Sequence, residues 1–282
     1  MLLLLTTTDV SAQDSKQYLE NIYQEALKTK KKDPIDQISL WLRVYNEIDK
    51  NHPYFLTVNK NLAQLFYGEK LYDESIVYFK NFKSTIVIKN NDDITDFTKY
   101  ASALSKTGQF EKSSEITNGI IKHHENNKQW VGVLNQLHIL VGTYNENKQY
   151  QKALQHNEEI LTLLKEKNYP AEEIIKIYNN IGYNYEKLNQ YQKAIDYYLL
   201  ALKSINKTNQ PDLYCTLLMN TGIVYYHLNN YNEQIKYFEL ANAQADCNKG
   251  QVYLMLSNVF KNKQDFYKAL LYAEMAEKFY VN

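Results

Sequence analysis

The chain has 282 residues, and its 32 Lys and Arg residues balance its 32 Asp and Glu residues, so the formal net charge is zero. Strong nucleic-acid binding needs a concentrated basic surface, so we expect no nucleic-acid partner. Tyr is frequent, with 26 copies, whereas only 8 Gly and 4 Pro occur. Most of these tyrosines fall in positions that repeat along the chain and are expected in the core, and the remainder are available to a binding face.

The first thirteen residues resemble the end of a secretory signal. An apolar run of four Leu follows Met1, and Ser11-Ala12-Gln13 supplies small residues before a cleavage point near Ala12. No basic residue precedes the run, and the run is shorter than that of most signals. We therefore keep two hypotheses for residues 1–13, a remnant of a secretory signal or a frayed terminus. The first implies an exported or periplasmic protein, and the second is compatible with a cytoplasmic one.

Residues 14–54 predict a divergent N-terminal helix pair. The segment from Ser15 to Lys28 carries its apolar residues on one helical side, and a second helix is expected to begin at Ile35. The basic stretch that ends at Pro34 separates the two helices. This connection is too long for a tight turn, so the pair differs from the repeated pairs after residue 54.

From residue 55 onward one pattern of apolar residues returns six times. A small or aliphatic residue opens each copy at Ala63, Ala101, Val141, Gly182, Gly222 and Ser257. Three residues later comes a larger apolar residue, at Phe66, Leu104, Tyr144, Tyr185, Tyr225 and Phe260. Six residues further lies an aromatic residue, at Tyr72, Phe110, Tyr150, Tyr191, Tyr231 and Phe266. A second position, usually small, comes after three more, at Ser75, Ser113, Ala153, Ala194, Gln234 and Ala269.

Each copy predicts two amphipathic helices joined by a tight turn. The spacings place the apolar residues on one helical face, and Asn or Gly residues in several of the connections tolerate the left-handed backbone of a helix end. Pro170 and Pro211 each stand where a new helix is expected to begin. One such pair buries only part of its apolar surface, so the copies are expected to stack in series. The predicted pairs occupy about residues 55–92, 93–132, 133–172, 173–212, 213–248 and 249–282.

These positions resemble the tetratricopeptide repeat (TPR), in a longer variant with a spacing near forty residues. The match is fullest from Tyr178 to Ala201 and next best from Gly222 to Ala241, where Gln234 replaces the usual Ala. The resemblance implies an all-α fold, a right-handed TPR-like α-solenoid of about seven antiparallel helix pairs.

The sequence offers no motif for catalysis or for a cofactor. It contains no Gly-rich phosphate loop, no Cys-x-x-Cys, no His-Glu-x-x-His and no Gly-x-Ser-x-Gly. The adjacent His123 and His124 point to different sides of a helix, so a shared metal site is not expected. We therefore predict a non-catalytic protein without cofactor or metal. Cys215 and Cys247 can form a disulfide on geometric grounds, but the chain has no disulfide framework and we expect them to stay unpaired.

In the TPR family the first helix of each pair lines a concave groove, and the resemblance carries this role onto thirteen residues here. They are His138, Asn145, Glu146, Asn179, Tyr183, Glu186, Lys187, Met219, Tyr226, His227, Asn258, Lys261 and Asn262. Asn amides pair with both the N–H and the C=O of a peptide, and Tyr adds rigid contact area. The implied partner is a protein or peptide segment of mixed polarity.

The C-terminal segment from Phe266 to Val281 is apolar on nearly all sides, although the last unit of an array normally shows a polar outer face. We expect further chain or self-association to cover it, and we expect no membrane span within this chain. The leading hypothesis is a protein-binding scaffold, the sensing or interaction region of a larger bacterial signalling protein. The alternative is a cytoplasmic TPR regulator that senses a peptide.

Overall fold

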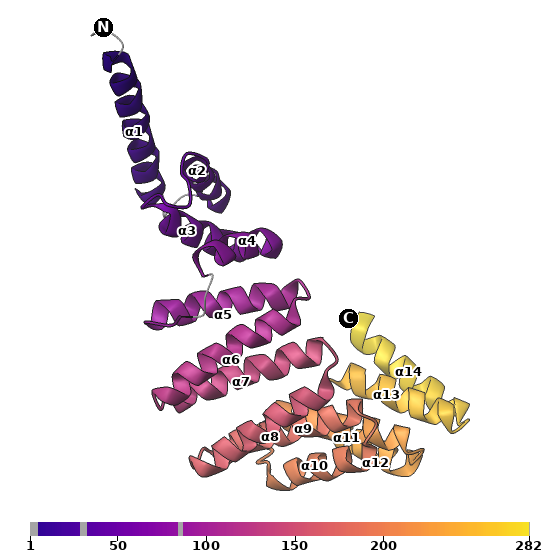
Figure 1. The fold of residues 1–282 in the computed structure, drawn as a ribbon. Coiled ribbons are helices and arrows are strands. Elements are labelled where there is room, and N and C mark those ends of the chain that lie inside the picture. Colours follow the sequence, from indigo (N-terminus) through magenta and orange to yellow (C-terminus); the bar gives the residue numbers. More distant parts are fainter. Residues whose placement is uncertain (1–4, 29–32, 84–86, 282) are drawn as a thin grey trace. The chain divides into compact units, whose positions relative to one another are not determined.

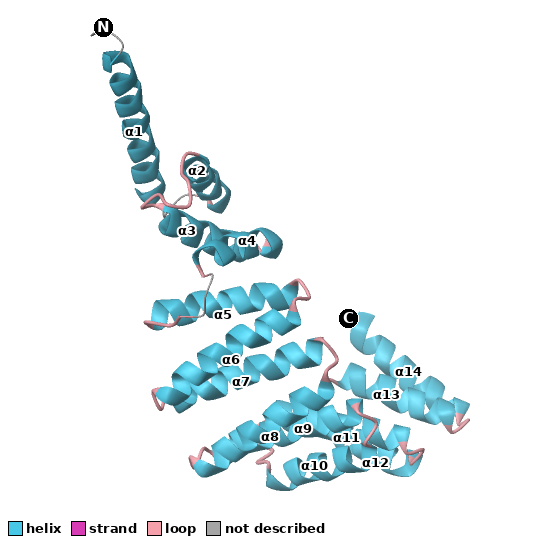
Figure 2. Ribbon diagram, in the orientation of Figure 1, coloured by secondary structure: helices cyan, strands magenta, loops and turns pink. Residues whose placement is uncertain are grey.

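The computed structural model describes residues 5–28, 33–83 and 87–281, and these residues form fourteen α-helices and no strand. Figures 1 and 2 show how the helices follow one another along the chain. The predicted all-α fold is therefore confirmed. The chain divides into two compact units, Met1–Gln136 and Leu137–Asn282. The first unit holds α1 (Leu5–Lys28), α2 (Pro34–Asn46), α3 (Phe55–Gly68), α4 (Tyr72–Phe82), α5 (Asn91–Lys106), α6 (Phe110–Asn126) and the beginning of α7.

The second unit holds the larger part of α7 and seven further helices. They are α7 (Trp130–Glu146), α8 (Tyr150–Glu166), α9 (Ala171–Lys187), α10 (Tyr191–Ser204), α11 (Pro211–His227), α12 (Tyr231–Asn242), α13 (Lys249–Asn262) and α14 (Phe266–Val281). Successive helices pack against each other from α1 to α6 and from α8 to α14, and the first helices of consecutive pairs also touch, α3 with α5 and α9 with α11. A series of antiparallel helix pairs produces this order of contacts.

The turn inside each of the six repeated pairs contains one residue with positive φ. These residues are Lys70, Gly108, Lys148, Asn189, Asn229 and Gln264, with φ between 55° and 78°. In each of these turns the amide after that residue donates to a carbonyl in the last turn of the preceding helix, as Gln190 donates to Tyr185 at 2.9 Å. One residue in the left-handed conformation therefore reverses the chain in every repeated pair, although this residue is a glycine only at Gly108.

Close packing between the helices of a pair depends on the small position that opens each copy. A Cβ atom added to Gly182 would lie 2.6 Å from the ring of Tyr198, and one added to Gly222 would lie 2.5 Å from the ring of Phe238. Both rings are fully buried. The aromatic ring of the second helix thus rests on the bare backbone of the first.

Two pairs of the first unit use serine at the second small position. The Ser75 hydroxyl donates to the Ala63 carbonyl at 2.8 Å, and the Ser113 hydroxyl donates to the Ala101 carbonyl at 2.7 Å. Each hydroxyl is buried and satisfied by the carbonyl of the residue that opens its own copy. This shared bond explains why serine is accepted where the TPR pattern usually has alanine.

An ionic cluster around the buried Asp96 joins three helices of the first unit. Asp96 on α5 is 1% exposed, accepts a hydrogen bond from Gln64 at 2.7 Å, and lies 3.2 Å from the Lys60 ammonium group. Lys83, directly after α4, pairs with Asp93 and lies 3.9 Å from Asp96. Burial acts to raise the pKa of Asp93, but hydrogen bonds from Lys83 and from backbone amides outweigh it and hold this pKa below its ordinary value.

Helices α1 and α2 pack against each other in the segment where the divergent N-terminal pair is predicted. Helix α1 begins at Leu5, about ten residues before the predicted start at Ser15, because no Pro or Gly interrupts that stretch. Residues 1–4 of the predicted signal remnant lie outside the described residues, and the signal assignment stays a prediction. In α2 the Asp33 side chain caps the helix by accepting from the Ile35 amide at 2.9 Å.

The expectation that the two cysteines stay unpaired is wrong. Cys215 on α11 and Cys247 in the connection before α13 form a disulfide, with Cα atoms 5.5 Å apart. The chain has no framework of cysteines that would suggest this bond, but stacking brings the connection after α12 back against α11. Both cysteines are buried in the core around Phe238 and Leu256.

Candidate protein-binding groove

The thirteen groove residues expected from the TPR resemblance all lie in the second unit, on the first helices of its pairs. Helix α7 carries His138, Asn145 and Glu146; α9 carries Asn179, Tyr183, Glu186 and Lys187; α11 carries Met219, Tyr226 and His227; α13 carries Asn258, Lys261 and Asn262. Most of them are engaged within the protein or surround an open pocket, whereas His138 is exposed on α7 and does not line that pocket.

Two of the expected asparagines, Asn145 and Asn179, form hydrogen bonds with carboxamide side chains of other helices. Asn184 donates to Asn145 at 2.7 Å, and Asn157 in turn donates to Asn184 at 2.7 Å. Asn184 and Asn157 are fully buried, so this network ties α7, α8 and α9 together. The sequence did not predict that Asn157 and Asn184 are buried, because the repeat pattern does not distinguish a buried Asn from a surface Asn.

A similar bond lies one pair further along, where Asn220 on α11 donates to Asn179 on α9 at 3.0 Å. Both side chains are half-buried. The bond joins the first helices of two neighbouring pairs and leaves only part of the Asn179 amide for a partner. The role predicted for Asn179 is therefore at least shared with a structural one.

Around Tyr183 the charged groups are paired with each other. The Lys187 ammonium group lies 2.8 Å from Glu186 and 5.0 Å from the centre of the Tyr183 ring. The hydrogen bond to Glu186 raises the pKa of Lys187 above its ordinary value. Burial, and then the nearby Glu186, raise the pKa of Tyr198, whose hydroxyl lies 3.4 Å from that carboxylate. This part of the surface is polar and internally neutralised.

Met219 and His227 differ in how far a partner can reach them. Met219 is 8% exposed and belongs to the core cluster around the disulfide, so it presents little surface. His227 is exposed and stacks on Tyr191, with ring centroids 4.6 Å apart. Tyr226 packs edge-on against His227 and is itself 44% exposed.

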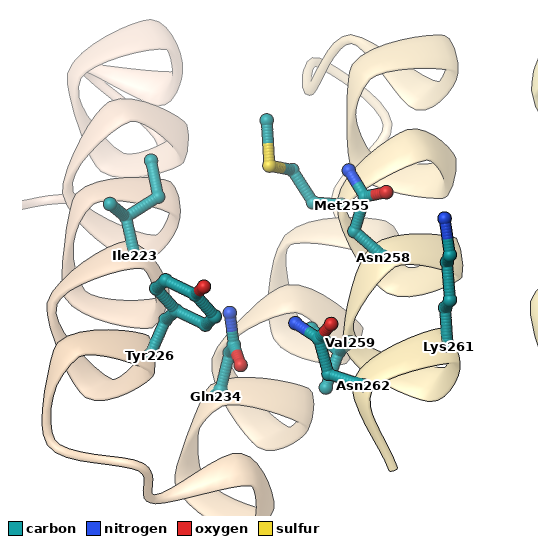
Figure 3. A pocket seen from close by; sticks show the side chains of 8 residues that line it. All are labelled: Ile223, Tyr226, Gln234, Met255, Asn258, Val259, Lys261 and Asn262. Atoms are coloured by element: carbon teal, nitrogen blue, oxygen red, sulfur yellow. The ribbon is translucent and has the colours of Figure 1, made fainter. Parts of the chain in front are cut away.

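The remaining residues meet in a pocket of about 410 Å³ between α11 and α13, which we call the α11–α13 pocket (Figure 3). Four expected residues line it: Tyr226, Asn258, Lys261 and Asn262. Four residues that sequence reasoning did not assign to the groove complete it: Ile223, Gln234, Met255 and Val259. This volume lies within the range of small-ligand sites, and the wall combines apolar side chains with a few convergent polar groups.

Gln234 at the floor of this pocket is unlike the residue at the same position in the other copies. In those copies the position holds Ser or Ala, whereas Gln234 extends from α12 so that its carboxamide lies between Tyr226 and Asn262 in Figure 3. Gln234 is 5% exposed, and its buried Oε1 atom accepts no hydrogen bond from the described residues. The departure from alanine was visible in the sequence, but its connection to a pocket was not.

A second hollow of about 310 Å³ lies beside the disulfide. Its lining includes Cys215, Cys247, Met219 and Asn220, and it shares Ile223 with the α11–α13 pocket. The two hollows therefore lie one after the other along α11.

The described residues contain neither a metal-binding cluster nor a helix suited to a membrane. No group of three or more His, Cys, Asp or Glu side chains there is placed to hold a metal ion. None of the helices there has both the length and the apolar character that a bilayer span requires.

Comparison with known proteins identifies the fold. The family model described as tetratricopeptide repeat matches residues 175–208, the region where the spacing is most regular. The structure of BtubC (BKLC) from P. vanneervenii is similar with a TM-score of 0.60 and 17% identity, over 80% of this chain and 91% of that one. The apo form of RapI is similar with a TM-score of 0.54 and 16% identity, over 79% of this chain and 97% of that one. No curated protein matches the chain.

A third similar structure is a much longer protein. It is a Signal Transduction ATPase with Numerous Domains that has a tetratricopeptide repeat sensor, PH0952 from Pyrococcus horikoshii. The TM-score is 0.53 at 18% identity, and the match covers 94% of this chain but 40% of that one. Together with the family match, these likenesses confirm the expected resemblance. The chain has the TPR-like α-solenoid fold and contains a tetratricopeptide repeat at residues 175–208.

Proposed function

We propose that the second unit is a non-catalytic scaffold that binds a protein or peptide segment along the first helices of its pairs. The observation that carries the proposal is the α11–α13 pocket, where four of the expected groove residues converge on one open volume. The carboxamides of Asn258 and Asn262 form no hydrogen bond within the described residues and are exposed, so they are available to a peptide. Tyr226 adds an exposed aromatic surface at low entropic cost.

The experiment begins with peptides selected from a random display library on the immobilised chain. Calorimetry then compares the wild type with the double variant Tyr226→Ser, Asn262→Ser. We expect at least a tenfold loss of affinity, because truncated aromatic anchors of an interface commonly cost more than about 1.4 kcal/mol.

The matched control is Leu240→Ser, which changes an exposed residue on the second helix of the same pair. It should bind the selected peptides as the wild type does, and circular dichroism should show unchanged helicity in all three proteins. Equal affinity for the wild type and the double variant would contradict the proposal, as would an equal loss in the control.

We further propose that this scaffold is the sensing or interaction region of a larger signalling protein that functions outside the cytoplasm. The TPR part of the PH0952 protein is named a sensor, and this chain spans less than half of that protein. The disulfide Cys215–Cys247 supports an oxidising location, since disulfides persist there and are rare in the cytosol.

The alternative, a cytoplasmic regulator that senses a peptide, differs in the state of these two cysteines. Alkylation of thiols in denaturant, after acid quenching of native cells, separates the hypotheses by mass spectrometry, because denaturation makes both buried cysteines accessible. A cysteine pair protected from alkylation until reduction supports the exported scaffold. Complete alkylation of Cys215 and Cys247 without reduction supports the cytoplasmic regulator.

We also propose that further chain or a second copy covers the outer face of α14. Leu270 on this face is 61% exposed, whereas the residues at the same position of the two matching helices α8 and α10, Leu154 and Ile195, are 3% and 2% exposed. Leu154 and Ile195 are buried because the first helix of the next pair packs on their helices, α9 on α8 and α11 on α10. Light scattering on the wild type and on Leu270→Glu tests self-association. A mass that rises with concentration only in the wild type supports it, and a strictly monomeric wild type at high concentration contradicts it.

A further inference from the structure

The α11–α13 pocket has three features that together restrict what fits it. Apolar side chains form its walls, a nearly buried carboxamide lies at its floor, and Lys261 is the one charged residue among the eight that line it. The apolar walls favour a ligand that is largely apolar, and the carboxamide favours a polar group at the end of that ligand. The positive charge of Lys261 disfavours a cationic ligand.

The walls favour an aromatic ring over an aliphatic chain. Ile223 and Tyr226 on α11 lie across the opening from Met255 and Val259 on α13, so both helices supply apolar surface (Figure 3). The Met255 side chain points from α13 toward α11 in Figure 3, and a methionine sulfur makes favourable contacts with ring edges. A short amide side chain would leave much of this apolar wall in contact with water.

The floor favours a hydroxyl group at the end of that ring. The Oε1 atom of Gln234 is buried without a donor among the described residues, and the Nε2 group, which carries N–H donors, points toward the opening in Figure 3. A phenol hydroxyl both accepts and donates hydrogen bonds, so one atom can accept from the Gln234 Nε2 group and donate to the carboxamide oxygen of Asn258 or Asn262. An indole N–H only donates, and a phenyl ring does neither.

We propose that the α11–α13 pocket is an anchor site for a tyrosine side chain of the bound segment, with Gln234 as the residue that selects its hydroxyl group. This inference rests on the proposed function of the groove and names the side chain that the groove recognises. At the other copies of the array Ala or Ser replaces Gln234, so the selectivity belongs to this pair alone.

The test uses two small probes in place of an unidentified partner. p-Cresol carries the tyrosine side chain, and toluene carries the phenylalanine side chain. The chain has four Met residues, so methyl-labelled Met255 gives a resolved signal from the pocket wall, and Met275, on α14 and not among the lining residues, gives a reference. Titration with each probe gives two affinities at one defined site.

We expect the Met255 methyl signal to shift with both probes and p-cresol to bind about three- to tenfold tighter, the effect of one hydrogen bond. In Gln234→Leu this preference should disappear while toluene binding remains. Gln234→Ala is the second variant, because Ala153, Ala194 and Ala269 show that the fold accepts alanine at this position. Gln192→Leu, on the exposed side of α10, is the matched control and should keep the preference.

Equal affinities of p-cresol and toluene for the wild type would overturn the proposal. A preference that survives in both Gln234 variants, or a Met255 signal that moves with neither probe, would do the same. These outcomes concern the pocket alone. A groove that binds selected peptides without a tyrosine preference leaves the proposed function intact, and a pocket that selects p-cresol while no peptide binds contradicts the proposed function only.

Discussion

At the level of single residues, the contact between the two helices of a pair depends on the space left by a missing side chain. Gly182 faces the fully buried ring of Tyr198, and a Cβ atom there would lie 2.6 Å from it. We expect Gly182→Ala to lower the free energy of unfolding by about 1–3 kcal/mol, the usual effect of overpacking. Urea denaturation followed by circular dichroism measures it.

Gly142 is the matched control, because it also lies inside a helix but has no atom within 4 Å of an added Cβ. Gly142→Ala should raise the free energy of unfolding by about 0.5–1 kcal/mol, since alanine favours the helix. Equal effects of the two substitutions would show that the ring of Tyr198 does not depend on the glycine.

The ion pair of Asp93 predicts a dependence of stability on pH. Its pKa is lowered in the folded state, so its contribution is fully present above the ordinary pKa of 3.8 and is lost as pH falls through the folded value. We expect Asp93→Asn to unfold more easily than the wild type at pH 6, by about 1–3 kcal/mol. The difference should shrink toward zero near the acid end of a pH series. If the difference in free energy of unfolding between wild type and variant stayed constant from pH 6 to the acid end of the series, the lowered pKa of Asp93 would be contradicted.

At the level of helices and turns, the disulfide closes a loop of 32 residues that contains α12. In the chain-entropy model a loop of this length stabilises the folded state by about 3–4 kcal/mol. The double variant Cys215→Ser, Cys247→Ser should therefore melt at a lower temperature. Reduction of the wild type should produce the same shift. A melting temperature unaffected by reductant, with both thiols shown to be free, would contradict the disulfide's role.

The turns offer a second prediction at this level. Lys148 adopts a φ of 56° between α7 and α8, where Gly108 serves in the pair before it. A non-glycine residue in this conformation costs about 1–2 kcal/mol of steric energy, partly offset by the greater entropy that glycine loses on folding. We expect Lys148→Gly to stabilise the protein by about 0.5–1 kcal/mol in thermal unfolding. Lys152→Gly, inside α8, should instead destabilise it.

The spacing of apolar residues was sufficient to predict the helix pairs, because burial of one helical face depends mainly on the positions of apolar residues. It did not predict the pairing of Cys215 with Cys247, which depends on how the connection after α12 folds back. Nor did it identify the bonds of Asn145 and Asn179, because their partners Asn184 and Asn220 look like surface residues in the sequence. The pocket was partly predictable: Tyr226 and Asn262 were expected, whereas Gln234 becomes meaningful only beside α13.

At the level of the whole molecule, the second unit is a TPR-like array whose pairs bury their apolar faces against one another. We propose that the first helices of the pairs then remain available to a partner. Helices α11 and α13 border a pocket where exposed Tyr and Asn side chains converge on apolar walls. We therefore expect a partner to protect these two helices and to leave the outer side of the array unchanged.

Hydrogen–deuterium exchange of the full chain, with and without a selected peptide, tests this claim most directly. We expect slower exchange in the segments 219–227 and 255–262, at the α11–α13 pocket, and no change in α10, which contributes no residue to its lining. Protection confined to α10 or α14, with 219–227 and 255–262 unchanged, would contradict the assignment of the binding groove.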